Sequence, residues 1–316
     1  MINVTVRSIK EIATCIRSFE LVPTTDESLP PFEAGAHIDV HLSGGLIRQY
    51  SLCGPPQLNN AYVIAVLETL DSKGGSRTMH ELREGESITI SEPKNHFPLT
   101  ANARHSILLA GGIGITPLLC MAERLALQGA SFELHYAARE QARAAFADRL
   151  MHPSLKTASH LYFDNEPSIG TLDLARTCAN PCSGKHLYVC GPAGFIEATL
   201  GAARQAGWAE ENLHREYFAG MLKADDESAT FRLKLAKSGL VVDVQSGQTA
   251  IQALALQGID VPTSCEQGVC GTCLTRVLDG VPDHRDMYLT NEERARNDYF
   301  LPCCSRAKSE ELIVDL

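Results

Sequence analysis

The feature that most constrains this chain is the spacing of four cysteines near its C-terminus. Four residues separate Cys265 from Cys270, two separate Cys270 from Cys273, and Cys303 follows after a further 29 residues. Thiolates in this arrangement are typical of the ligands of a plant-type [2Fe–2S] cluster. The last third of the chain is therefore predicted to carry electrons one at a time.

The loop between these cysteines has to bend tightly around the metal. Gly268 and Gly271 lack the Cβ atoms that would clash there, and backbone amides can donate to the sulfurs. Zinc sites usually pair two short Cys-x2-Cys segments, and only one is present, so zinc is the weaker interpretation. Idle, reduced cysteines are the other alternative. Cys304 stands next to Cys303, and the spacing from Cys273 favours Cys303 as the fourth ligand.

Length and composition set limits on the rest. A chain of 316 residues is expected to form about two to three domains. It has no apolar run of transmembrane length and no export signal at its start, so we expect no membrane insertion. Eleven cysteines without such a signal indicate reduced thiols in the cytoplasm. A net charge of −10 argues against nucleic acid and is compatible with a partner that carries a positive patch.

The first two regions differ in their hydrophobic pattern. Residues 1–102 contain short alternating segments, such as 62–67, separated by Gly, Pro and Asn, which predicts an antiparallel β-barrel or sandwich. In residues 103–222, apolar strands such as 106–110 alternate with helical stretches such as 116–127. That alternation predicts an α/β domain with a parallel sheet.

The C-terminal part is predicted to be a smaller α+β domain. Residues 223–229 are polar and acidic, without apolar periodicity, and are expected to be a linker. Within residues 230–316, segments 231–235 and 241–245 have the pattern of a hairpin, and 249–257 has that of a helix. The cysteine loop follows directly.

A glycine-rich turn in the middle region suits a diphosphate. Gly111, Gly112 and Gly114 follow an apolar strand, and Thr116 and Pro117 open a helix. Glycines allow close backbone approach, and free N–H groups at a helix start attract phosphate. A purely structural turn is the alternative, because such a turn alone is a weak signal.

Two further segments of this region belong to the same predicted edge of the sheet. Cys190, Gly191 and Pro192 end another apolar strand, where ligands bind in open α/β sheets, although a lone Cys190 is more often a core residue. After the strand at 132–137 comes Arg139 in a stretch of mixed charge. Composition therefore leaves the choice between NADH and NADPH open, with Arg139 as the favoured contact.

The first region supplies groups for a phosphate and a flat ring. Cations, hydroxyls and an aromatic ring stand near glycine turns, a combination that suits both. The residues are Arg48, Tyr50, Ser51, Gly74, Gly75, Ser76 and Arg77. Taken alone, alternating Arg and Tyr on a strand more often form a solvated face of a sheet.

Together and in this order, these motifs resemble the phthalate dioxygenase reductase family, which includes reductases of the vanillate demethylase type. The resemblance covers the whole chain, and the cysteine signature is its most specific part. It implies a ferredoxin–NADP reductase-like pair of domains, an FMN-binding barrel and an NAD-binding domain. A C-terminal plant-type ferredoxin domain of the β-grasp fold would follow. Residues 283–286 also look like the family, with a structural role beside the cluster as the alternative.

The resemblance assigns roles to single residues. It implies that the FMN phosphate and ribityl chain are held by Arg48, Gly75, Ser76 and Arg77. Tyr50 and Ser51 would lie along the isoalloxazine, with Ser51 near N5. Phe218 would stack on the ring where the nicotinamide enters, and Cys190 and Thr116 would lie near the site of hydride transfer.

The function implied is a relay in aromatic catabolism or a similar pathway. Nicotinamide gives up two electrons as a hydride and the cluster accepts one, so a flavin is needed between them. Electrons would pass from NADH through FMN and the cluster to a Rieske-type terminal oxygenase, which hydroxylates or demethylates a small organic acid or amine.

Two alternatives stay open. The first is an FAD-dependent reductase that serves a di-iron hydroxylase or another acceptor; the short connection over residues 68–74 leaves little room for an adenosine-binding insertion and so favours FMN. The second is a non-enzymatic, redox-responsive binding protein that retains the cofactors for regulation.

Overall fold

The computed structural model describes residues 1–316 except 26, 55–59, 70–73, 167–169 and 219–228. The chain forms two compact units, Met1–Phe218 and Ala219–Leu316, and each is described by itself. Of the predicted linker, all but Ala229 lies outside the described residues. The predicted boundary at residue 102 falls inside the first unit and stays a prediction. Among the helices of the described residues, none has both the length and the apolar character needed to cross a membrane.

The N-terminal half of the first unit is an antiparallel barrel. Its strands are β1 (Ile2–Ala13), β2 (Ile16–Pro23), β3 (His37–His41), β4 (Ile47–Ser51), β5 (Tyr62–Leu67) and β6 (Ser87–Ile90). They are ordered β4-β3-β6-β1-β2-β5, and every pairing is antiparallel. A bridge between Leu52 and Ile64 joins the two outer strands and closes the sheet. The alternating pattern of the sequence thus gives the predicted barrel, with the short helices η1 (Ser43–Gly45) and α1 (Gly75–Glu81) in its connections.

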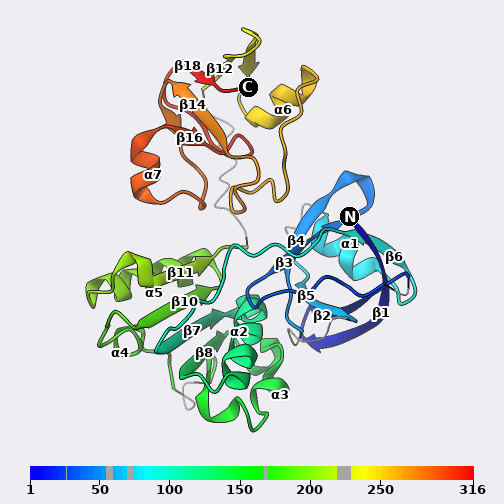
Figure 1. Ribbon diagram of the computed structural model, residues 1–316, viewed down its shortest axis with the longest axis vertical. Helices are drawn as coiled ribbons and strands as arrows, with labels where there is room; N and C mark the ends of the chain where they lie inside the picture. Colours follow the sequence, from blue (N-terminus) through cyan, green and yellow to red (C-terminus); the bar gives the residue numbers. More distant parts are fainter. Residues whose placement is uncertain (26, 55–59, 70–73, 167–169, 219–228) are drawn as a thin grey trace. The chain divides into compact units, whose positions relative to one another are not determined.

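The other half of the first unit is a parallel sheet covered by helices (Figure 1). Its strands are β7 (His105–Gly111), β8 (Phe132–Ala138), β9 (Ser159–Phe163), β10 (Lys185–Cys190) and β11 (Leu213–Glu216). Its helices are η2 (Gly112–Gly114), α2 (Ile115–Leu127), η3 (Gln141–Arg143), α3 (Ala147–Leu150), η4 (Lys156–Ala158), α4 (Leu174–Thr177), α5 (Ala193–Gln205) and η6 (Glu210–Asn212). The predicted α/β domain is therefore confirmed.

The strand order of this sheet reverses its direction at the centre. The order is β11-β10-β7-β8-β9, so the chain leaves the centre in one direction after β7 and in the other after β10. With right-handed crossovers, α2 and α5 lie on opposite faces, as Figure 1 shows. Such a reversal opens a crevice at the carboxyl ends of the two central strands. Residues 106–111 of β7 are all buried, as expected for a strand covered on both faces.

In its described residues, the second unit is a mixed sheet with two short helices. The strands are β12 (Phe231–Leu235), β13 (Val241–Val244), β14 (Thr275–Asp279), β15 (Pro282–Asp283), β16 (Tyr299–Phe300), β17 (Arg306–Ala307) and β18 (Glu311–Val314), and the helices are α6 (Ala250–Leu256) and α7 (Asn291–Arg296). The main sheet has the order β13-β12-β18-β14-β16, with β12 and β18 parallel. The predicted hairpin and helix are present, and the unit is the expected α+β domain of the β-grasp type.

Both helices of this unit begin with a capping box. Thr249 and Gln252 exchange side-chain and backbone hydrogen bonds at the start of α6, and Thr290 and Glu293 do the same at the start of α7. Each box satisfies amide groups that a helix start leaves without partners. The caps therefore fix where the two chain segments beside the cysteine loop become helical.

Candidate functional site

Two loops meet at the crevice of the parallel sheet, and glycines make the contact possible. A Cβ atom on Gly114 would lie 2.2 Å from the carbonyl oxygen of Cys190, and one on Gly191 would lie 3.0 Å from the Cα of Gly111. The structure therefore brings together the two motifs predicted from the sequence, the glycine-rich turn after β7 and the Cys190 to Pro192 turn after β10.

The start of α2 is shaped for an anionic ligand. Thr116 is 2% exposed and its hydroxyl donates to the carbonyl of Ile113 at 3.0 Å, which fixes the first turn, where Pro117 is also buried. Gly112 has a φ of +55°, and no atom lies within 4 Å of the position its Cβ would take. Backbone amides beside open space at a helix start are suited to a diphosphate.

A polar cluster of buried Ser51 and Cys190 and half-buried Glu216 lies beside these loops. Cys190 and Glu216 pair in register at the ends of β10 and β11, and the Ser51 hydroxyl at the end of β4 donates to Glu216 at 3.4 Å. Ser51 is 5% exposed and Cys190 is fully buried. The barrel and the parallel sheet each contribute to this site, so it exists only when the two are packed together.

Burial controls the charge of this cluster. Desolvation raises the pKa of Glu216 to about 8, and the hydrogen bond from Ser51 offsets only part of that effect. Burial, and next the neighbouring Glu216, raise the pKa of the Cys190 thiol well above its usual value. At neutral pH the site therefore presents a protonated carboxyl and a neutral thiol, and the carboxyl can hold or release a proton near pH 8.

Glu216 is the residue of this site that the sequence reasoning did not propose. In the sequence, Glu216 is marked only by its position. It stands at the carboxyl end of a strand and two residues before Phe218, the ring proposed to stack on the flavin. Phe218 itself is 37% exposed, which suits a ring that covers a ligand better than a core residue.

The predicted phosphate-binding residues of the barrel lie at the start of α1. A Cβ atom on Gly75 would lie 2.6 Å from Cγ of Arg48, so the arginine stem packs directly against this glycine. Gly74 has a φ of +97°, and the Ser76 hydroxyl accepts a hydrogen bond from the Thr69 amide at 3.2 Å. The structure thus brings Arg48 against Gly75 at the start of α1, where Arg77 adds an exposed cation.

Tyr50 is not part of a solvated face of the barrel sheet. It lies two positions from Arg48 on β4, is partly buried and packs against the hydrophobic core. Burial raises the pKa of its phenol above the ordinary value, which keeps the ring neutral. Neutral aromatic surface beside an arginine suits a flat ring that carries a phosphate tail.

The predicted nucleotide contact Arg139 follows the last residue of β8. Its side chain is exposed, whereas Arg143 is paired with Glu140 at 2.9 Å between Nε and Oε1. Arg139 is therefore the more available of the two arginines for a nucleotide phosphate.

The four predicted cluster ligands form two pairs in the second unit. Cys265, Cys270, Cys273 and Cys303 are between 3% and 7% exposed. A side-chain hydrogen bond with Cys265 lowers the pKa of the Cys270 thiol, and a side-chain hydrogen bond also links Cys273 to Cys303. Two pairs of sulfurs fit a cluster of two irons, each with two protein thiolates.

The loop from Cys265 to Cys273 leaves no room for a side chain at its two glycines. Gly268 and Gly271 have φ values of +73° and +72°. A Cβ atom on Gly268 would lie 2.4 Å from Sγ of Cys304, and one on Gly271 would lie 2.3 Å from Cζ of Tyr288. Cys304 donates to the carbonyl of Leu301 at 3.7 Å, so it packs against the loop backbone. This cradle fits a [2Fe–2S] cluster, and Cys303 stays the predicted fourth ligand.

Two protein-family models match parts of the chain. Residues 233–308 match the 2Fe-2S iron-sulfur cluster binding domain. Residues 88–213 match the N-terminal domain of DmmA-like dimethylamine monooxygenase subunits.

Named relatives span the whole chain. It is 50% identical over 317 residues to the vanillate O-demethylase oxidoreductase of Pseudomonas sp. (strain HR199 / DSM 7063), covering 100% of both chains. It is 39% identical to the carnitine monooxygenase reductase subunit of Acinetobacter baumannii, covering 100% of this chain and 98% of that one. Among solved structures, phthalate dioxygenase reductase superposes with a TM-score of 0.79 at 35% identity, covering 99% of this chain and 97% of that chain.

Proposed function

The chain belongs to the phthalate dioxygenase reductase family of iron–sulfur oxidoreductases, and from this premise we propose its electron path. Electrons pass from NADH through FMN and a [2Fe–2S] cluster to a Rieske-type terminal oxygenase. The single observation that supports this proposal most is that one chain holds both the edge of the parallel sheet where Ser51, Cys190 and Glu216 meet and a loop with two cysteine pairs.

The residues of the crevice have defined tasks in this proposal. A bound flavin supplies the conversion between a two-electron hydride and single electrons. The amides around Gly112 bind the nucleotide diphosphate. Ser51 and Glu216 would hold a proton at their hydroxyl and carboxyl oxygens beside a bound flavin. Cys190, neutral and buried, would limit the space open to a bound nicotinamide ring.

FMN is favoured over FAD by the position of the cations. Arg48 lies against Gly75 at the start of α1, and the chain goes from the end of β5 at Leu67 to Gly74 in few residues. This short connection offers little chain for contacts to an adenosine moiety, although residues 70–73 lie outside the described part. Mass spectrometry of the released flavin distinguishes the two, and recovery of FAD in stoichiometric amount contradicts the proposal.

For the partner we propose an oxygenase that demethylates a methoxylated aromatic acid such as vanillate. The support is the 50% identity, over the whole length of both chains, to a vanillate O-demethylase oxidoreductase. A mixture of this protein, such an oxygenase, NADH, O2 and vanillate should yield formaldehyde and the demethylated phenol, with consumption of NADH and O2. Equal rates with an unrelated oxygenase and its substrate contradict this choice of partner.

The reductase activity itself can be tested without the partner. We expect continuous NADH-dependent reduction of ferricyanide, which accepts electrons from flavin, and of cytochrome c, which accepts them through the cluster. A single stoichiometric reduction without turnover supports the alternative of a redox-responsive binding protein. The proposal places the chain in the cytoplasm, where its eleven cysteines, all free in the structure, stay reduced.

A further inference from the structure

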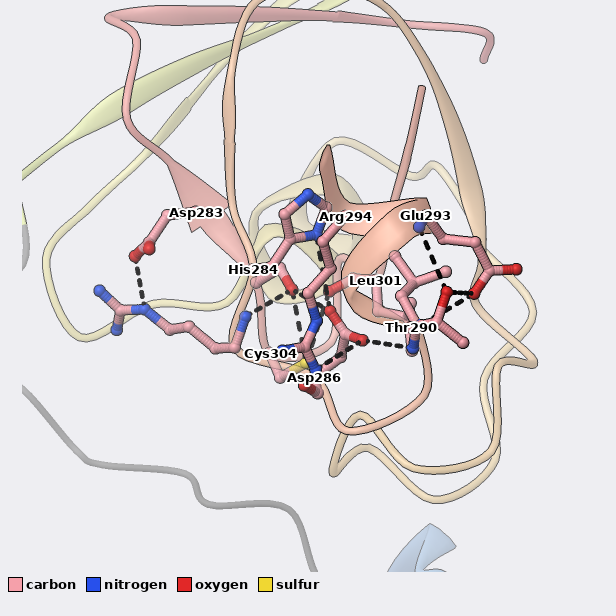
Figure 2. A network of polar contacts seen from close by, with 11 residues as sticks. Asp283, His284, Asp286, Thr290, Glu293, Arg294, Leu301 and Cys304 are labelled. Atoms are coloured by element: carbon pink, nitrogen blue, oxygen red, sulfur yellow. Dashed lines mark hydrogen bonds and ion pairs between the residues drawn. The ribbon is translucent and has the colours of Figure 1, made fainter. Parts of the chain in front are cut away.

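A buried carboxylate lies behind the cysteine loop. The side chain of Asp286 has no exposed surface. Its Oδ2 accepts from the Leu289 amide at 2.8 Å, and its Oδ1 accepts from the Ser305 hydroxyl at 3.3 Å. Figure 2 shows the surrounding network. An anion removed from water in this way acts on its neighbours with little screening.

Asp286 is joined to both segments that carry the cysteines. The amide of the next residue, Met287, donates to the carbonyl of Gly268 at 2.9 Å, and a Cβ on Gly268 would lie 3.0 Å from the Asp286 Cα. Its partner Ser305 follows Cys303 by two positions. The carboxylate is thus held at a fixed place relative to the predicted ligands.

One cation is held next to this anion. Arg294 lies on α7, whose start is fixed by the capping box, and its Nη2 donates to the backbone carbonyl of Asp286. The same Nη2 lies 3.8 Å from Oδ2, and the buried Arg294 Nε has no hydrogen-bond partner among the described residues. The two charges are therefore close without being locked into a bidentate pair.

His284 is the third group of the network. Its Nδ1 lies 3.7 Å from Oδ1 of Asp286, and neither ring nitrogen has a hydrogen-bond partner in the described part of the chain. The neighbouring pair Asp283 and Arg285 differs, because both side chains are more than a quarter exposed and their charges meet at 2.8 Å. Water screens that second pair.

We propose that Asp286 and Arg294 act as a pair of opposed charges that sets the reduction potential of the cluster. Reduction adds negative charge to the cluster, so a fixed anion opposes it and a fixed cation favours it. Asp286 thus lowers the potential and Arg294 raises it. Both are positioning residues rather than ligands, and the inference rests on the proposed function because it requires a cluster in the loop.

The test uses the full-length holoprotein and two substitutions of opposite sign. Asp286→Asn keeps an oxygen for the Leu289 amide and removes the charge, and Arg294→Gln removes the cation. In redox titrations followed by the cluster's EPR signal, the ratio of reduced to oxidised cluster at a fixed solution potential should rise about tenfold in Asp286→Asn and fall about tenfold in Arg294→Gln. The double variant should return close to the wild type, and Arg294→Lys should stay near it.

The control is Asp283→Asn, which removes the same charge from the exposed pair and should shift the ratio much less. Shifts of the same sign in Asp286→Asn and Arg294→Gln overturn the proposal, since loss of structure alone has no reason to give opposite signs. If Asp286→Asn loses its cluster, an unchanged or raised ratio in Arg294→Gln also overturns it. Failure of the proposed function is distinguishable, because the wild type would then show no cluster signal.

Discussion

Ser51 donates a hydrogen bond of 3.4 Å to Glu216, a residue 165 positions further along the chain and in a different sheet. The contact ties the barrel to the carboxyl edge of the parallel sheet. Because the carboxyl of half-buried Glu216 is desolvated there, its pKa rises from 4.5 to about 8, and this makes the site sensitive to pH in a defined direction.

The first prediction concerns this pH dependence. Between pH 4.5 and 8 the folded protein binds the Glu216 proton and the unfolded chain does not. The resulting stabilisation is complete below pH 4.5 and is lost as pH rises through 8, by at most about 1.36 kcal/mol per pH unit. Glu216→Gln cannot ionise and should lack this loss. In urea unfolding of the flavin-free protein, its stability relative to wild type should increase from pH 6 to pH 8; a constant difference contradicts the assignment.

The second prediction concerns the cluster ligands. Changing Cys265, Cys270, Cys273 or Cys303 to Ser should remove the visible iron–sulfur absorbance, because each thiolate is one of two on its iron. Flavin reduction by NADH should persist in stopped-flow traces. Cys304→Ser should retain the cluster, since its sulfur packs against Gly268 and donates to Leu301. Loss in Cys304→Ser with retention in Cys303→Ser would reverse the assignment.

The third prediction uses two glycines with the same backbone conformation. Gly268 and Gly258 both have a φ of +73°, but only Gly268 lacks space for a Cβ atom. Gly258→Ala should lower the unfolding free energy by about 1 kcal/mol and keep the cluster. Gly268→Ala adds the collision with Cys304 and should lose most of its iron. Iron and sulfide analysis of both variants checks this. Equal iron contents would contradict the claim that the cluster needs a glycine at position 268.

The fourth prediction concerns the flavin. Arg48→Ala and Arg77→Ala should each weaken flavin binding by about 1.5–3 kcal/mol, because the phosphate loses a charged hydrogen-bond partner. Flavin remaining after dialysis, read from absorbance at the flavin band, checks this. Arg139→Ala is the matched control and should keep its flavin after dialysis. Full retention in both barrel variants would mean that these arginines form only a solvated face.

The fifth prediction concerns the nicotinamide. We expect a higher kcat/KM for NADH than for NADPH, and Arg139 as a contact of the nucleotide, because its side chain is exposed and Arg143 is paired with Glu140. Initial rates at low salt with each nucleotide decide the preference. A clear preference for NADPH that is lost in Arg139→Ala would confirm Arg139 as a contact of the nucleotide. It would also show that the preference for NADH is wrong.

Local patterns could be predicted from the sequence because their causes are local. The spacing from Cys265 to Cys273, with glycines between, specifies a tight loop whatever surrounds it. The alternation along β12 reflects one covered face and the apolar run of β7 reflects two, so the hairpin strand and the parallel sheet could be predicted.

Contacts over long distances in the sequence could not be predicted in the same way. Nothing near Glu216 in the chain indicates that Ser51 lies beside it or that its carboxyl is desolvated. The closure of the barrel between Leu52 and Ile64 and the burial of Asp286 also depend on packing. Residues 283–286 look polar in sequence, although one of their two aspartates is buried and the other is partly exposed.

The contact of Gly114 with the Cys190–Gly191 peptide has a mechanical consequence. Since backbone touches backbone there without intervening side chains, neither loop can shift without displacing the other. A nucleotide whose diphosphate binds at the start of α2 would therefore also restrict movement at the end of β10. Docking of the distal part of the nucleotide would in this way immobilise the place where its reactive ring must settle.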